Sequence, residues 1–269
     1  MSRLLQVSDT HFGTERAAVM DDLVALCRQL EPDVVVLSGD ITQRARRHQF
    51  EAAARFWARM QAPARLVIPG NHDIALFNLF SRLFHPYRLH RASFGDELEP
   101  VVETPALLVL GVNTTRPHRH KHGEVSAAQV ARVCERLRAA SPAQLRVVVT
   151  HQPVDVPEGT DENNLLRGHA AAVPAWVAAG ADVLMGGHIH LPFVRPLSLR
   201  YPGLPRRAWC VQAGTAISHR VRGNMPNSVN VIAHDPGRGE SVAERWDHVE
   251  GKGFVRTERN PLALDRAAD

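Results

Sequence analysis

The chain has 269 residues, room for one large domain or two small ones, and its 44% apolar content and net charge of +4 are ordinary for a globular protein. No apolar run approaches the ~20 residues that cross a bilayer, and the first residues enter a strand pattern without a signal-peptide core. The three cysteines have no CxxC spacing, so we expect free thiols and a cytoplasmic location, without a zinc ribbon or a disulfide framework.

The first half of the chain alternates strand and helix patterns. Short apolar runs predict strands at 3–8, 33–38 and 64–70, with helical periodicity at 15–30 and 47–60 between them. This βαβαβ order favours parallel strands in a sheet covered by helices. A further helix is predicted over residues 74–84, where Pro86 ends it.

In the second half, helices alternate with strands up to His190 and are absent from the pattern after it. Strands are predicted at 105–114, 145–152 and 181–188, with helices at 127–140 and 170–179. Beyond His190, the runs 206–214, 228–235 and 242–249 follow one another without a helix, which favours an antiparallel arrangement. No repeat or long linker divides the chain, so we expect one mixed α/β domain over 1–269. Residues 251–269 could belong to this domain or form a C-terminal extension of it.

Polar side chains follow five of the predicted strands. In an open α/β sheet, sites form at the carboxyl ends of the strands, so we expect these side chains to meet. Taken singly, each motif is common in turns, and only their recurrence at successive strand ends indicates a site. The set is Asp9, His11, Asp40, Asn71, His72, Asp73, His151, His188 and His190.

These residues have the donor chemistry of a metal centre. Imidazole, carboxylate and amide without thiolate suit Zn, Fe, Mn or Co. The donors are too many for one tetrahedral ion and fit two ions that share a bridging carboxylate. Such a pair holds a nucleophile and phosphate oxygens together. Gly39, Gly70 and Gly187 precede the ligands and allow tight turns with close backbone approach.

The motifs resemble a known superfamily. "DTH" (9–11), "GD" (39–40), "GNHD" (70–73), "H" (151) and "GHIH" (187–190) are similar to the D-x-H, G-D, G-N-H-D/E, H and G-H-x-H pattern of the calcineurin-like metallophosphoesterases. Segments 113–129 and 212–232 also resemble the bacterial class III cyclic-nucleotide phosphodiesterase branch. The resemblance implies an α/β fold, a four-layer α/β/β/α sandwich of two mixed sheets flanked by helices.

The resemblance also implies roles for the site residues. His72 would lie beside the phosphate without binding metal, where it stabilises the transition state or protonates the leaving group. A metal-bound hydroxide would attack phosphorus, and the two divalent or trivalent ions would be Fe, Mn or Zn. One ion would take Asp9, His11, Asp40 and His190, and the other would take Asp40, Asn71, His151 and His188, with Asp40 bridging.

We therefore expect a phosphoesterase that hydrolyses small phosphodiesters such as 3',5'-cyclic nucleotides. Diesters should be preferred to monoesters, because the sequence alone identifies no deep cationic pocket. The chain is poor in aromatic residues and only mildly basic, so no nucleic-acid polymer is expected as a partner. A homodimer is a further possibility at this stage.

An alternative is a hydrolase of glycerophosphodiesters or of lipid-linked phospho- or pyrophosphoesters with the same site. It depends on segment 74–84, whose stripe of Leu76, Leu79, Phe80 and Leu83, widened by Phe77 and Phe84, could be a lid for an acyl chain. The favoured reading is a helix packed on the core or in a dimer interface. Contact with a membrane surface stays open, and the histidine at position 72 counts against the lipid A pyrophosphohydrolase branch, which usually has arginine there.

Two basic clusters and one carboxylate complete the predictions. The loop 116–123 follows a strand that ends at Asn113, and His120 and His122 could contact the phosphate or the base, or simply be solvated. Cluster 44–49 is read as a solvated loop that could attract anions. Asp73 is expected to cap the N-terminus of the following helix rather than to orient His72.

Overall fold

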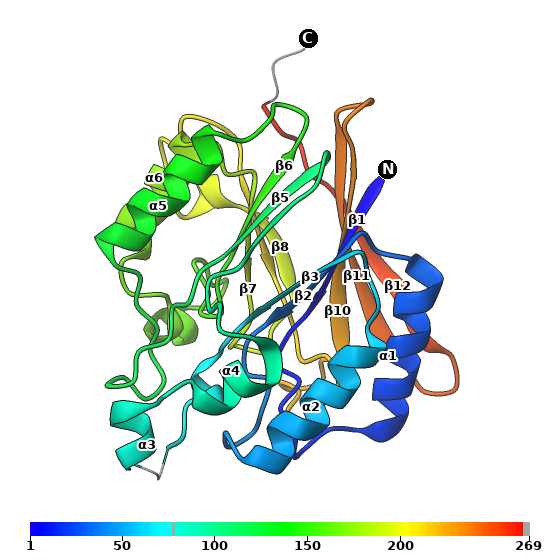
Figure 1. Cartoon of the computed structure of the whole chain (residues 1–269). Helices are drawn as coiled ribbons and strands as arrows, with labels where there is room; N and C mark the ends of the chain where they lie inside the picture. Colours follow the sequence, from blue (N-terminus) through cyan, green and yellow to red (C-terminus); the bar gives the residue numbers. More distant parts are fainter. Residues whose placement is uncertain (77–78, 266–269) are drawn as a thin grey trace.

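Two six-stranded sheets form the centre of the molecule. The computed structural model describes residues 1–76 and 79–265 (Figure 1). In the first sheet the order is β12-β11-β10-β1-β2-β3, with β1, β2 and β3 parallel and β10, β11 and β12 antiparallel. These strands are β1 (Ser2–Val7), β2 (Val34–Ser38), β3 (Ala64–Ile68), β10 (Ser228–Asp235), β11 (Glu240–Val249) and β12 (Gly253–Pro261).

The second sheet has the order β4-β5-β6-β7-β9-β8. Its central strands β5, β6, β7 and β9 are parallel, and the edge strands β4 and β8 are antiparallel to their neighbours. The strands are β4 (Val101–Glu103), β5 (Leu107–Gly111), β6 (Leu145–Val149), β7 (Val183–Gly186), β8 (Phe193–Pro196) and β9 (Trp209–Gln212).

Helices cover the outer faces of both sheets. Figure 1 shows α1 and α2 on the side of the first sheet and α5 and α6 on the side of the second. The helices are α1 (Ala17–Leu30), α2 (Arg47–Arg59), α3 (Leu79–Phe84), α4 (Arg88–Phe94), α5 (Ala127–Arg138) and α6 (His169–Ala178).

Three apolar cores hold the four layers together. One lies between the first sheet and helices α1 and α2, and another lies between the second sheet and helices α5 and α6. The third joins the inner faces of the sheets, where Leu4 and Val36 meet Val147 and Met185. Because both faces of β2 and β5 are buried, these strands are apolar runs without alternation. The four-layer α/β/β/α sandwich predicted from the motifs is confirmed.

One strand prediction needs correction, and a segment that was left open is now assigned. The run 206–214 contains β9, which pairs parallel with β7, although an antiparallel region was expected after His190. The connection through β8 and a 3₁₀ turn returns the chain to the same end of the sheet, and the sequence pattern does not show this. Residues Gly253–Pro261, left open as an extension, form β12 and complete the first sheet beside β11.

The predicted helix 74–84 is wrong in its first part. Asn71–Asp73 form a 3₁₀ turn, residues 74–76 are not helical, and the helix α3 is Leu79–Phe84. Its side chains do not pack on the core: Phe80 is 68% exposed, Leu83 70% and Phe84 63%. Phe77 and the side chain of Leu79 lie outside the described part. A core role for this stripe is therefore excluded for Phe80, Leu83 and Phe84.

Within residues 1–76 and 79–265, no helix has both the length and the apolar content needed to cross a membrane.

Candidate metal centre

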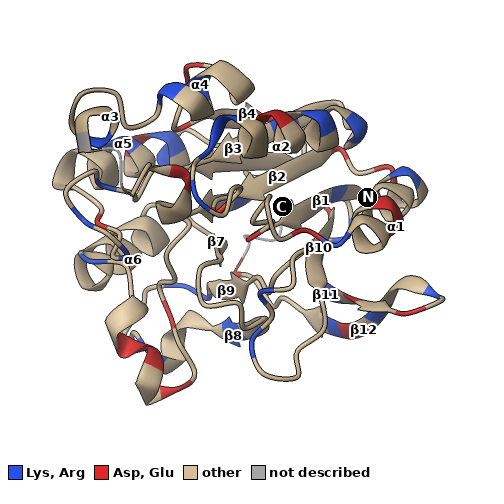
Figure 2. Cartoon of the chain, turned by 90° about the horizontal axis from the view of Figure 1, so that it is seen from below, with Lys and Arg blue, Asp and Glu red and all other residues tan. Residues whose placement is uncertain are grey.

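The polar residues predicted from the motifs meet at one edge of the two sheets. Loops after β1, β2 and β3 of the first sheet and after β6 and β7 of the second converge there, and Figure 2 views the molecule from that side. The ligand-bearing loops thus come from both sheets, and the site lies where the inner faces of the sandwich open. Sequence order alone did not divide the loops between two sheets.

The backbone at this edge is unusual. Seven described residues other than glycine have positive φ, and five of them are predicted ligands, a conformation that costs free energy for such residues. The surrounding structure must therefore hold the loops in place. The five are Asp9, His11, Asp40, His188 and His190.

Two glycines allow the loops to approach one another. A Cβ atom on Gly70 would lie 2.0 Å from the backbone nitrogen of Asp40, and one on Gly187 would lie 2.5 Å from Oδ2 of Asp9. Neither position can carry a side chain without moving a predicted ligand, so the expected close approach is present.

The first ligand group is Asp9, His11 and His190. The Nε2 atoms of the two histidines are 3.2 Å apart, and Nε2 of His190 is 3.3 Å from Oδ1 of Asp9. Ser8 donates to the other oxygen of Asp9, and the backbone nitrogen of His188 donates to both. Three donor atoms from two loops, one after β1 and one after β7, thus converge on one point.

The second group is Asp40, His151 and His188. Nε2 of His151 is 3.2 Å from Oδ1 of Asp40, and the donor atoms of the group lie within 4.8 Å of one another. The other oxygen of Asp40 is 3.9 Å from Nε2 of His11 in the first group. Asp40 therefore faces both groups, as a bridging carboxylate must.

Backbone carbonyls orient two of the imidazoles. Nδ1 of His151 donates to the carbonyl of Ser38 at 2.9 Å, and Nδ1 of His190 donates to the carbonyl of Arg220. Each bond fixes the tautomer and leaves the lone pair of Nε2 directed into the site.

Burial tunes the protonation of the histidines. It lowers the pKa of His11 and of His188 to about 3, so both rings are neutral and have the form that binds metal. For His151, burial is outweighed by the Asp40 carboxylate, which raises the pKa to about 9, so an entering cation has to displace a proton there.

Unsatisfied polar atoms test whether a cation fits. Among the described residues, Oδ1 of Asn71 and both ring nitrogens of His188 are buried without a hydrogen-bond partner. Such atoms are costly unless a ligand completes them. Four histidines, two aspartates and one asparagine match the nitrogen and oxygen donors of Zn, Fe or Mn, so the residues fit a dinuclear centre.

Asp73 has a different role from the helix cap that was expected. Its carboxylate accepts from the backbone nitrogens of Gly70, Ile41 and Thr42 and from the Thr42 hydroxyl, at 2.8–3.0 Å. Because Asp73 ends a 3₁₀ turn and residues 74–76 are not helical, Asp73 does not cap an α-helix. Burial and the charge of Asp40 raise the pKa of Asp73 to about 6, and the three backbone donors oppose this shift. Asp73 ties the two loops that carry Asp40 and Asn71.

Replacing Asp73 by alanine should destabilise the protein by about 2–5 kcal/mol, since three buried backbone N–H groups lose their acceptor. Denaturant unfolding of the metal-free protein measures the effect. Asp96→Ala, at an exposed position, is the control. Equal unfolding midpoints for the two variants would show that Asp73 does not hold the loops.

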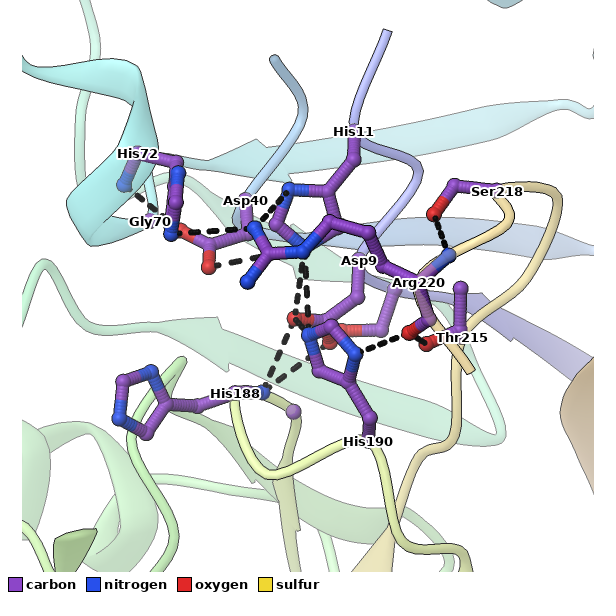
Figure 3. A network of polar contacts seen from close by, with 12 residues as sticks. Asp9, His11, Asp40, Gly70, His72, His188, His190, Thr215, Ser218 and Arg220 are labelled. Carbon is purple, nitrogen blue, oxygen red and sulfur yellow. Dashed lines mark hydrogen bonds and ion pairs between the residues drawn. The ribbon is translucent and has the colours of Figure 1, made fainter. Parts of the chain in front are cut away.

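His72 lies beside the first ligand group, with its ring centroid 5.0 Å from that of His11. Nδ1 donates to the backbone carbonyl of Gln43 at 2.9 Å, which leaves Nε2 as an acceptor, 3.2 Å from Nη1 of Arg220. The backbone nitrogen of His72 donates to Oδ1 of Asp40 at 2.8 Å. Figure 3 shows His72 and His11 on either side of the Arg220 guanidinium.

A cavity of about 480 Å³ opens over the ligands, a size that holds a small organic ligand. Of the three residues predicted to contact substrate, only His120 lines it. Asn113 accepts from Thr115 in a local turn, and His122 lines a separate surface cavity.

Sequence reasoning gave no role to several residues that line this cavity. They are Lys121, Asp161, Asn164, Arg220 and Arg222. Arg220 and Arg222 belong to segment 212–232, which was noted only for its resemblance, and Lys121 belongs to the basic loop. The available signal for Arg220 and Arg222 was their closeness in a polar segment. A search for polar residues directly after predicted strands does not find them, because they lie within the loop between β9 and β10.

The fold and the ligand-rich edge are those expected of the calcineurin-like phosphoesterases. The chain belongs to the calcineurin-like phosphoesterase family, whose model matches residues 2–192 and so includes every predicted ligand.

Comparisons with single proteins agree with this family. A cAMP/cGMP dual specificity phosphodiesterase of Mycobacterium tuberculosis (strain CDC 1551 / Oshkosh) is 27% identical over 203 residues, 70% of this chain, and the chain spans 61% of that relative. A dimetal phosphatase from Danio rerio superposes with a TM-score of 0.67 at 14% identity, over 97% of this chain and 98% of the other. The purple acid phosphatase PPD1 of yellow lupin gives 0.66 at 11% identity, over 97% and 53%. These structures share the fold.

Proposed function

We propose that this protein is a dinuclear-metal phosphodiesterase that hydrolyses small phosphodiesters, among them 3',5'-cyclic nucleotides. The observation that carries the proposal is Asp40, whose two oxygens face two groups of buried donors. The likeness to a cyclic-nucleotide phosphodiesterase supports the substrate class.

The proposed ligand sets follow the two groups. Asp9, His11, Asp40 and His190 would hold one ion, and Asp40, Asn71, His151 and His188 the other. We propose Fe, Mn or Zn. When bound, such ions act as Lewis acids and lower the pKa of water towards neutrality.

His72 acts on the phosphate from the cavity side. Its ring is held by the Gln43 carbonyl, so Nε2 faces the cavity with a fixed orientation. From there it can contact a phosphate oxygen or deliver a proton to the leaving alkoxide. The cytoplasmic location and a homodimer stay predictions.

A substrate panel tests the proposed function. Purified protein loaded with Mn, Fe or Zn is assayed on 3',5'-cyclic AMP, a glycerophosphodiester, bis(4-nitrophenyl) phosphate and 4-nitrophenyl phosphate. We expect turnover of cyclic AMP and the aryl diester that chelation abolishes. Protein that contains two ions and hydrolyses no diester would refute the proposal.

One observation favours the second candidate, a hydrolase of lipid-linked phosphoesters. The exposed side chains of Phe80 and Phe84 lie with ring centroids 4.8 Å apart on α3. Arg82 of the same helix donates to the carbonyls of Ala75 and Arg119 and so ties α3 to the basic loop at the cavity. An apolar surface beside the site suits an acyl chain, and it suits a dimer contact equally.

Replacing Phe80 and Leu83 together by serine separates these readings. Because both side chains are more than two-thirds exposed, the free energy of unfolding of the monomer should change by less than about 1 kcal/mol. If α3 covers an acyl chain, hydrolysis of a phosphatidyl substrate falls and cyclic AMP turnover is kept. Loss of a dimer on a sizing column assigns the surface to self-association. Leu199→Ser, a 63% exposed residue elsewhere, is the control.

A further inference from the structure

We propose that Arg220 is a phosphate-binding residue that adapts this site to dianionic phosphomonoesters in addition to diesters. The proposal rests on the proposed function, and it goes beyond it by adding a substrate class and the residue that selects it.

The position of Arg220 is fixed by its own backbone. Its nitrogen donates to the Ser218 hydroxyl at 3.0 Å, and its carbonyl accepts from the Thr215 hydroxyl at 2.8 Å and from Nδ1 of His190. Asn227 donates to the carbonyls of Thr215 and Ser218. The loop that carries Arg220 is therefore braced against a predicted metal ligand, so the guanidinium is held where the site forms.

The guanidinium lies at the mouth of the centre. Nη1 is 3.1 Å from Oε1 of Gln43, 3.2 Å from Nε2 of His72 and 3.3 Å from Nδ1 of His11 (Figure 3). All three contacts use one terminal nitrogen. An arginine has five N–H donors, so most of the fork remains for an anion.

The charge of Arg220 has no dedicated carboxylate. Among the described residues Arg220 forms no ion pair, whereas Arg222 in the same cavity is paired with Asp161 and Glu158. Asp9 and Asp40 lie on the other side of His11 and belong to the proposed ligand sets. A half-buried arginine without its own counter-ion, beside a site for phosphate, is suited to bind two oxygens of that phosphate.

Lys121 adds a second cation on the cavity wall. It lines the cavity, is exposed, and forms no ion pair within the described chain. The cavity thus contains the cationic surface that the sequence did not reveal. A phosphodiester has one negative charge and a monoester has up to two, so this surface favours the monoester more.

The added reaction is hydrolysis of a phosphomonoester. The ester P–O bond breaks, a water oxygen bonds to phosphorus, and a proton from that water ends on the leaving alkoxide, which gives an alcohol and inorganic phosphate. A cyclic nucleotide opened by the diesterase reaction leaves such a monoester in the same cavity.

The test compares wild type with Arg220→Gln and Arg220→Lys, all loaded with Mn. We expect both variants to keep two ions by elemental analysis. In Arg220→Gln, binding of inorganic phosphate, measured by calorimetry, should weaken roughly 10–100-fold, the scale of a charge-assisted hydrogen bond. The ratio of kcat/KM for 4-nitrophenyl phosphate to that for bis(4-nitrophenyl) phosphate should fall at least about fivefold. Arg220→Lys should recover part of the loss.

Arg55→Gln controls for net charge. Arg55 is exposed on α2, and its side chain forms no ion pair in the described chain, so the variant should change phosphate binding less than about twofold. Unchanged phosphate affinity and an unchanged substrate ratio in Arg220→Gln would overturn the proposal. Failure of the wild type on every ester would refute the proposed function instead, and phosphate binding would still decide the role of Arg220.

Discussion

Asp40→Ala is expected to lose both metal ions and nearly all activity. The two oxygens of Asp40 face different donor groups, Nε2 of His151 at 3.2 Å and Nε2 of His11 at 3.9 Å. Removing the carboxylate also removes the acceptor of the His72 backbone nitrogen. The loss of metal affinity and activity should exceed the roughly 10–100-fold effect of changing a residue that only hydrogen-bonds to a metal ligand. Elemental analysis and turnover of the aryl diester measure both effects.

Comparison variants sharpen this test. Asn71→Ala removes a donor from one proposed set only, so it should keep one ion firmly bound, while exposed Asp96→Ala should keep both. Treatment of the wild type with a chelator should abolish activity, and Mn or a similar ion should restore it. Two ions still bound to Asp40→Ala would contradict the bridging role.

His72→Ala should keep its metals and lose rate by roughly 10²–10⁴, the usual contribution of one acid–base group. The ring binds the Gln43 carbonyl through Nδ1 and faces Arg220 and the cavity through Nε2, so neither ring nitrogen belongs to the two donor groups. Single-turnover rates on a diester and elemental analysis measure the two outcomes. His48→Ala, an exposed histidine on α2, is the control.

The leaving group shows which role His72 has. If it protonates the alkoxide, the loss in His72→Ala should be small for a nitrophenyl ester and large for an alkyl ester, because nitrophenolate needs little protonation. If the rate falls equally for both esters, the remaining role of His72 is to stabilise charge on the phosphate in the transition state. Loss of an ion from His72→Ala would make it a ligand and refute the assignment.

Some features of the site were predictable because they depend on local chain order. Asp-x-His or Gly-Asn-His-Asp directly after a strand puts donor atoms at the edge of whichever sheet contains that strand. The glycines beside them indicate that two backbone segments come close together there. Asp73 was misread as a helix cap because its partners, Ile41 and Thr42, come from a loop some thirty residues earlier. The exposed α3 was misread because periodicity in segment 74–84 does not reveal which neighbours it has.

The sequence by itself determined the four-layer class, the donor chemistry and the family, since each depends on residue type and order along the chain. Only the tertiary structure decided that the donors fall into two groups joined by Asp40, and that Arg220 enters the same site from a loop between β9 and β10. The physical reason is that both facts depend on packing between two sheets. Residues more than one hundred positions apart become neighbours there, and no local pattern encodes such distances.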